Sequence, residues 1–173
     1  LIQAYRNRGH QAAKLDPLGM MERELVPDLT LEYHGLSKED LKTIFKTDTL
    51  EIGTDEASLQ DIIDALQSIY CGELGIEYNY IVNTEERKWF QGILEPNLGQ
   101  CSFKSDEKKY IFNRLNSAEG LAKFLAAKYP GMKRFGIDGC ESLIPLVDSL
   151  IQNCGILGAC LLYTSDAADD GTG

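Results

Sequence analysis

The segment 59–70 constrains the fold more than any other part of the chain. Its apolar residues recur at the spacing of an α-helix, while Asp61, Asp64 and Gln67 take the opposite side. This pattern predicts one amphipathic helix with a single buried stripe. The stripe consists of Leu59, Ile62, Ile63, Leu66, Ile69 and Tyr70.

Capping residues predict where two further helices begin. Asn83 and Glu86 form a pair typical of a capping box, and Pro96 helps to end the helix that follows them. Ser105, with Asp106 and Glu107 after it, suits the positive end of another helix. We expect the first of these two helices to bury an apolar edge formed by Trp89, Phe90, Ile93 and Leu94.

The helix that begins at Ser105 is expected to break near Asn116 or Ser117, and a further helix should end at the turn 129–131. A last helix begins near Ser142 or bends at Pro145, because proline inside a helix removes a backbone hydrogen bond. Its apolar residues are Leu143, Ile144, Leu146, Val147, Leu150 and Ile151.

The other segments are less regular. Residues 1–8 read as helix, Ser37 and Asp40 cap a short helix, and 76–82 and 134–137 are expected to be short extended pieces. The pattern therefore predicts a mostly α fold. We divide the chain into a helical domain at 1–130, a second segment at 131–154 and a tail at 155–173.

The tail differs in composition from the rest of the chain. From Gly155 onward the periodicity disappears and small polar residues dominate, so that 155–173 looks like a translated vector junction. We expect the tail to be disordered or only opportunistically collapsed. We also expect the preceding helix to lack cover, which would leave Leu143, Leu146 and Leu150 less buried than Ile62 and Leu66.

Composition excludes several classes of protein. The 173 residues carry a net charge of −10, which argues against a protein that binds nucleic acid through its phosphates. The longest apolar run, 156–163, is far shorter than the roughly 20 residues that span a bilayer, and no leader is visible. Five cysteines without paired spacing indicate reduced, packing side chains in a cytosolic or matrix-like compartment. They are Cys71, Cys101, Cys140, Cys154 and Cys160.

Local motifs for chemistry are weak. Gly131 and Gly136 have the spacing of a phosphate loop, but Ile137 and Asp138 stand where a lysine and a hydroxyl must contact phosphate and Mg²⁺. His10 and His34 are too few for a histidine-based metal site, and each is expected to be a hydrogen-bonded structural residue. The acids Asp166, Asp169 and Asp170 are assigned to a solvated tail. Taken alone, these residues predict a helical domain of unknown purpose.

Five segments along the sequence, taken together, give a more specific result. The first is residues 1–19, LIQAYRNRGHQAAKLDPLG. It resembles the signature near the start of the thiamine-dependent dehydrogenase components of 2-oxoglutarate dehydrogenase complexes, and of bacterial members above all. The resemblance continues in register through 65–81, 84–89, 117–121 and 133–145. The chain is therefore identified as an N-terminal fragment of a member of this family.

The resemblance implies an activity for the whole enzyme. Members of the family are homodimers that decarboxylate 2-oxoglutarate on thiamine diphosphate with Mg²⁺, as part of the tricarboxylic acid cycle. They pass the succinyl group to a lipoyl group on the dihydrolipoyl succinyltransferase core. The expected location is the cytoplasm of a bacterium, or the mitochondrial matrix in a eukaryote. Relatives that act on 2-oxoadipate, other decarboxylases and a non-catalytic helical interaction module are the alternatives.

The resemblance also divides the chain. Residues up to about 130 correspond to a helical N-terminal domain. Residues 133–153 correspond to the first strand and helix of the α/β domain that binds thiamine diphosphate, here truncated. The family's catalytic histidines and Mg²⁺ ligands are expected downstream. We therefore assign no catalytic, cofactor-binding or metal-binding residue and expect the fragment to be inactive.

Some residues remain candidates for supporting roles. By the same resemblance, Arg134, Asp138 and Glu141 are the residues expected nearest the active-site region, with a helix cap or an interdomain ion pair as the alternative. Arg8, His10 and Asp16 are expected to be interdomain or surface anchors. Some animal members bind calcium in this region. Gln11, Glu24 and Val26 occupy the places of the calcium ligands here, which argues against calcium regulation.

Overall fold

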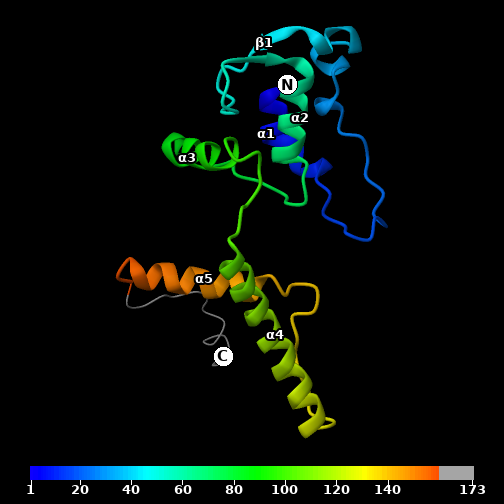
Figure 1. Cartoon of the computed structure of the whole chain (residues 1–173). Coiled ribbons are helices and arrows are strands. Elements are labelled where there is room, and N and C mark those ends of the chain that lie inside the picture. Colours follow the sequence, from blue (N-terminus) through cyan, green and yellow to red (C-terminus); the bar gives the residue numbers. More distant parts are fainter. Residues whose placement is uncertain (160–173) are drawn as a thin grey trace, which may run out of the picture. The chain divides into compact units, whose positions relative to one another are not determined.

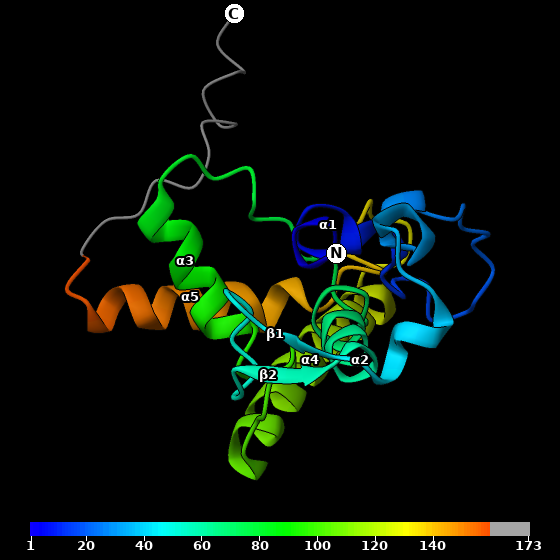
Figure 2. The same cartoon turned by 90° about the horizontal axis from the view of Figure 1, so that it is seen from above.

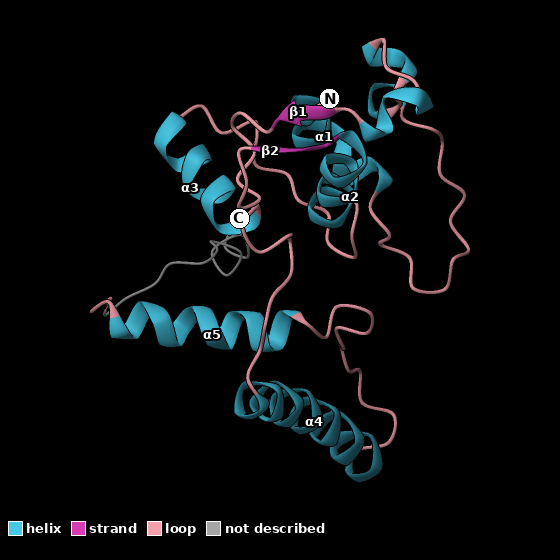
Figure 3. Cartoon of the chain, turned by 45° about the horizontal axis from the view of Figure 1, so that its top comes forward, coloured by secondary structure: helices cyan, strands magenta, loops and turns pink. Residues whose placement is uncertain are grey.

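The computed structural model describes residues 1–159, which divide into two compact units at Ser102 (Figure 1). The first unit is Leu1–Ser102 and the second begins at Phe103, whereas the sequence suggested a domain boundary at residue 130. Helices dominate both units, as predicted (Figure 3). Within residues 1–159 no helix is long and apolar enough to cross a bilayer.

The first unit combines three α-helices, four 3-10 turns and a two-stranded antiparallel sheet in which Ile44 lies opposite Ser58. The sheet was not predicted; its strands are short, and β2 leads directly into α2 (Figure 2). In chain order the elements are α1 (Ile2–Arg8), η1 (Gly9–Ala12), η2 (Pro27–Leu29), η3 (Glu32–His34), η4 (Lys38–Lys42), β1 (Ile44–Lys46), β2 (Glu56–Ser58), α2 (Leu59–Tyr70) and α3 (Thr84–Leu94).

Helix α2 forms the centre of the first unit and confirms the predicted stripe. The Ser58 hydroxyl caps it by accepting from the Asp61 amide at 3.2 Å, and the Asp61 and Asp64 side chains stay exposed. All stripe residues except the half-buried Ile63 are buried, together with Ala65. The core cluster consists of Tyr5, Leu50, Ile62, Leu66, Ile69, Tyr70 and Tyr78.

The end of α1 touches the end of α2. A β-carbon added at Gly9 would lie only 2.5 Å from the Cβ atom of Tyr70, so only glycine fits between the two helices at this point. This contact places the last residue of α2 directly beside the first helix of the chain.

Helix α3 begins as predicted, but only part of its predicted apolar edge packs on the core. The Asn83 side chain accepts from the Glu85 and Glu86 amides at 2.9 and 3.4 Å, which confirms the cap. The predicted buried edge is half right. Leu94 packs against the core and the Phe90 ring stacks on Tyr78, but Trp89 is 62% and Ile93 45% exposed. The inner side of the helix is formed by half-buried residues, Arg87, Gln91 and Leu94.

The second unit is built on α4 (Ser105–Lys128) and α5 (Leu143–Ile156), which pack on each other. The predicted break of α4 near Ser117 is wrong. The Ser117 hydroxyl donates to the Asn113 carbonyl at 2.8 Å, so this residue is accommodated inside a continuous helix. Ser105 is the first helical residue rather than the cap, while the end of the helix before Tyr129 is confirmed.

Helix α5 starts after Ser142 and tolerates Pro145 in its first turn. Its apolar residues are poorly covered, as predicted: Leu146 is 61% exposed, compared with 4% for Ile62 and 0% for Leu66. The helix continues through Gly155 and Ile156, so the tail predicted from the sequence begins too early. The rest of the predicted disordered tail, from residue 160 on, lies outside the described residues.

Two predicted extended pieces are not strands. Neither 76–82 nor 134–137 pairs with another segment among residues 1–159, and both are irregular. A strand requires a hydrogen-bonded neighbour, and none of the described segments supplies one. The expected first strand of an α/β domain is therefore absent from this part of the structure.

Candidate functional site

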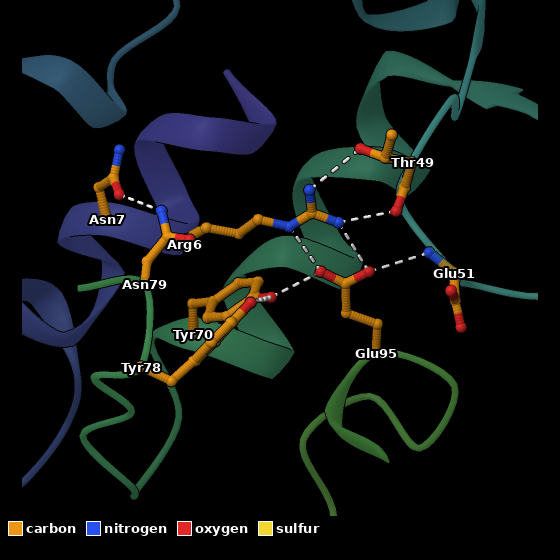
Figure 4. A network of polar contacts seen from close by, with 8 residues as sticks. All are labelled: Arg6, Asn7, Thr49, Glu51, Tyr70, Tyr78, Asn79 and Glu95. Carbon is orange, nitrogen blue, oxygen red and sulfur yellow. Dashed lines mark hydrogen bonds and ion pairs between the residues drawn. The ribbon is translucent and has the colours of Figure 1, made fainter. Parts of the chain in front are cut away.

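A buried ion pair between Arg6 of α1 and Glu95, directly after α3, is the main polar feature of the first unit (Figure 4). The Arg6 Nε and Nη2 atoms donate to the two carboxylate oxygens of Glu95 at 2.8 and 2.9 Å. Arg6 is 2% and Glu95 0% exposed. The geometry is the bidentate arrangement that gives the strongest arginine–carboxylate bonds.

Each side-chain nitrogen of Arg6 and each carboxylate oxygen of Glu95 has a hydrogen-bond partner. Arg6 also donates to the hydroxyl and carbonyl oxygens of Thr49 at 3.0 and 2.7 Å. Glu95 accepts from the Glu51 amide at 3.0 Å and from the Tyr70 hydroxyl at 2.6 Å. We call these residues, with Tyr78, the Arg6–Glu95 network.

The Tyr78 hydroxyl completes the network. It lies 2.8 Å from the Tyr70 hydroxyl and donates to it, because the Tyr70 proton already goes to Glu95. Beside the network, the Asn79 and Asn7 side chains hydrogen-bond to each other (Figure 4). Segments far apart in the sequence are thus joined at one buried point.

Burial and the carboxylate determine the protonation of the network. Burial raises the pKa of Tyr70 well above its ordinary value, and the bond to Glu95 raises it further. Burial also raises the pKa of Tyr78. For Arg6 burial acts to lower the pKa, but the Glu95 carboxylate outweighs it and the pKa is raised. Both tyrosines stay neutral and Arg6 stays charged.

This arrangement holds the fold rather than performing chemistry. A general acid or base needs an accessible site that can exchange a proton with a substrate, and each Glu95 oxygen is already occupied by two donors. Removing one partner of a buried pair leaves an uncompensated charge, which typically costs about 3–5 kcal/mol. The sequence did not reveal the network, because Arg6 and Glu95 are 89 positions apart.

The three predicted anchors make contacts within the first unit. Arg8 pairs with the Asp28 carboxylate at 3.1 Å. The Asp16 carboxylate accepts from the amides of residues 18, 20 and 21, and these backbone bonds lower its pKa. The His10 Nε2 atom lies 3.7 Å from the Glu77 carboxylate. All three therefore fix the segment that follows α1.

The two histidines differ in their hydrogen bonds. The His34 Nε2 atom bonds to the Asp28 carbonyl at 2.8 Å, which confirms a structural role. The buried Nδ1 atom of His10 has no hydrogen-bond partner in the described part of the chain, contrary to our expectation. The contact of this ring with a charged group is the one between its Nε2 atom and the Glu77 carboxylate, at 3.7 Å.

In the second unit the structure brings Arg134, Asp138 and Glu141 to one hollow beside α4. All three are exposed, and none bonds to another of the three. Arg134 donates to the Tyr129 carbonyl at 3.1 Å, and Glu141 accepts from the Gly139 amide at 2.9 Å, which lowers the Glu141 pKa. These contacts are local and stabilise the loop between α4 and α5.

The described residues do not provide a metal site. Over residues 1–159 no three His, Cys, Asp or Glu side chains come close enough to hold a metal ion. Cys71, Cys101, Cys140 and Cys154 are free thiols, and burial raises the pKa of Cys71. A bound Mg²⁺–diphosphate group needs convergent oxygen ligands, and this part of the chain does not fit that requirement.

Comparison with known proteins identifies relatives that match most of the chain. It is 49% identical over 158 residues to the 2-oxoglutarate dehydrogenase E1 component of Azotobacter vinelandii. It is 40% identical over 158 residues to the protein of the same name from Cupriavidus necator. Each match covers 91% of this chain but 17% of the relative. No family model matches the chain.

Identity of this extent shows that the chain is homologous to proteins that are named as dehydrogenase components. More specifically, it is homologous to a segment of the 2-oxoglutarate dehydrogenase E1 components, and the resemblance found in the sequence motifs is confirmed. The chain spans about a sixth of the length of these relatives. The Arg6–Glu95 network and the anchors Arg8 and Asp16 therefore lie in a segment that corresponds to about a sixth of these relatives' length.

Proposed function

We propose that this chain forms part of a 2-oxoglutarate dehydrogenase E1 component. The enzyme would decarboxylate 2-oxoglutarate with thiamine diphosphate and Mg²⁺ and pass the succinyl group to a lipoyl group of the succinyltransferase core, within the tricarboxylic acid cycle. The observation that carries this proposal is 49% identity over 91% of the chain to a protein of that name. We further propose a homodimer in the cytoplasm of a bacterium.

The role we propose for the described segment is structural. Its most buried polar groups, Arg6 and Glu95, are saturated by one another and by their neighbours. Thiamine diphosphate would supply the electron sink for decarboxylation. Its ligands are expected in the part of the relatives' length that this chain does not span, so no catalytic step is assigned to residues 1–159.

A chimera tests the proposed function. The matching residues of the Azotobacter vinelandii protein would be replaced by those of this chain, and oxidation of 2-oxoglutarate would be measured with the purified, folded chimera. We expect activity within a few-fold of the parent, because the replaced segment keeps its own network. A folded chimera without activity, beside an active parent, would contradict the proposal.

The chain alone provides a complementary test. Because fixed ligands and metal supply most of the stabilisation in such sites, the isolated chain should show no decarboxylation. Calorimetric titration with thiamine diphosphate and Mg²⁺ should give no saturable heat. Saturable binding would place cofactor ligands within this segment and overturn our assignment.

A further inference from the structure

Helix α3 presents an uncovered apolar ridge with acidic residues around it. Trp89 and Ile93 lie one turn apart on its outer side and are 62% and 45% exposed. Glu85 and Glu86 precede Trp89 by one turn, and both line a small hollow with Trp89 and Phe90. We call Glu85, Glu86, Trp89 and Ile93 the α3 outer face.

The helix is attached to the core by its inner side and its end. The Phe90 ring stacks on Tyr78 with centroids 5.8 Å apart, and Glu95 is fixed by Arg6 immediately after the last turn. A helix of this length is marginal in water unless an apolar face is buried. The helix is thus attached to the core away from its outer face, while Trp89 and Ile93 face solvent.

The charged residues around Trp89 and Ile93 favour a basic partner. Besides Glu85 and Glu86, the Glu51 carboxylate lies 3.8 Å from where a β-carbon of Gly92 would be, on the same helix. Arg87 is turned inward and donates to the Ile81 carbonyl at 3.3 Å, which leaves Lys88 as the basic side chain of α3 that remains outside. A second copy would bring the same acids together, whereas a basic partner would pair with them.

We propose that the α3 outer face docks a basic amphipathic segment, with apolar side chains on Trp89 and Ile93 and lysines or arginines opposite Glu85 and Glu86. We assign this segment to the remainder of the longer enzyme, since the chain spans 17% of its relatives' length; this source rests on the proposed function. Tryptophan is a frequent centre of binding energy in such interfaces.

The chain contains one tryptophan, so Trp89 is a specific fluorescent probe of this surface. Overlapping synthetic peptides covering the rest of the Azotobacter vinelandii protein would be titrated into the 173-residue chain. We expect free Trp89 to emit as indole in water. Peptides with basic and apolar residues should shift the emission to shorter wavelength in a saturable way, and more weakly at high salt.

Variants separate the electrostatic component of the binding from the apolar component. Glu85→Lys combined with Glu86→Lys should weaken binding about tenfold, since rim charges tune affinity and its salt dependence. Ile93→Asp should abolish the shift while keeping Trp89. Leu25→Asp, at another exposed apolar position of the first unit, is the matched control and should change nothing. Circular dichroism melts would establish that each variant is folded.

Several results would overturn the proposal. They are a free chain whose Trp89 emission is already blue-shifted, no peptide that binds, binding that prefers acidic peptides, or binding that survives Ile93→Asp. Concentration-dependent dimerisation abolished by Ile93→Asp would assign the face to a second copy instead. Peptide binding with an inactive chimera would count against the proposed function, whereas an active chimera without peptide binding would count against the docking surface.

Discussion

Helices α2 and α5 have similar apolar stripes but very different surroundings. In α2 the stripe is buried, with Leu66 completely enclosed. In α5 the equivalent side chains of Leu143, Leu146 and Leu150 are about half exposed or more, at 48, 61 and 49%. Periodicity therefore identifies the face of a helix that can be buried. Whether it is buried depends on segments elsewhere in the chain or in its partners.

The two units also differ in how polar groups are used. The first unit encloses a saturated ion pair between Arg6 and Glu95. In the second unit no residue from 103 to 159 is buried, and the helices are linked by exposed bonds such as Tyr110 to Asp148 at 2.6 Å. We infer that the first unit has its own core, whereas α4 and α5 need additional cover.

The largest effect should come from breaking the buried ion pair. Glu95→Ala leaves the Arg6 charge uncompensated and should lower the free energy of unfolding by about 3–5 kcal/mol in urea melts. The matched change in the second unit is Glu119→Ala, which removes an exposed pair with Lys123 at 3.0 Å. It should cost less than about 1 kcal/mol. Equal losses of unfolding free energy for the two variants would show that the buried pair stabilises the first unit no more than the exposed pair stabilises the second.

Replacing both charged residues tests whether the uncompensated charge causes the loss of stability. Arg6→Met combined with Glu95→Leu removes the uncompensated charge that either single change leaves behind. The double variant should therefore be more stable than Glu95→Ala alone. A double variant that is less stable would mean that hydrogen bonds to Thr49 and Tyr70, rather than the charge, dominate.

Truncating a buried apolar side chain should cause the next largest loss of stability. Leu66→Ala should cost about 2–5 kcal/mol, because the buried side chain leaves a cavity. Leu146→Ala should stay within about 0.5 kcal/mol, as should Asp64→Ala on the exposed side of α2. Urea melts monitored by circular dichroism would measure all three. A large loss for Leu146→Ala would show that α5 is covered in solution.

Replacing two glycines by alanine should change the stability of the protein in opposite directions. Gly9→Ala brings a β-carbon to 2.5 Å from the Tyr70 Cβ atom, and such overpacking costs about 1–3 kcal/mol. Gly120 lies inside α4 with open space around it, so Gly120→Ala should stabilise that helix by about 0.5–1 kcal/mol. Thermal melts of each variant would give the signs. Destabilisation by Gly120→Ala would reveal a close neighbour of α4.

The smallest effect is a pH dependence confined to the first unit. Burial raises the folded-state pKa of Tyr70 above the ordinary value of 10.0. The folded protein therefore keeps the phenolic proton while the unfolded chain releases it, so this stability is present below pH 10 and lost as the pH rises. We expect a loss of about 1 kcal/mol over the first pH unit above that value. Tyr70→Phe should reduce the slope, and Tyr33→Phe, at an exposed position, should not.

Local signals in the sequence predicted local structure well. The caps at Ser37 and Asn83 and the stripe of α2 are confirmed, because each depends on residues a few positions apart. The break expected near Ser117 is wrong, since its hydroxyl finds a carbonyl within the helix. Helix propensity alone does not show that the Ser117 hydroxyl bonds to the Asn113 carbonyl.

Long-range structure could not be predicted in the same way. Glu95 gave no local signal, and its pairing with Arg6 depends on a fold that brings distant segments together. Trp89 and Ile93 were assigned to a buried edge because they are apolar, but the inner side of α3 is set by Arg87, Leu94 and the position of Glu95. The segment 1–19 was one of the five that carried the family resemblance, and its residues Arg6 and Arg8 form ion pairs within the first unit.

Hydrogen exchange of the 173-residue chain tests the contrast between the units most directly. Amides in α2 should exchange only through global unfolding, because their helix encloses the core. Amides in α4 and α5 should exchange at least about tenfold faster through local opening, since few apolar contacts hold these helices. Equal protection of α2 and α5 would contradict the account, because it would mean that the second unit has a core as complete as that of the first.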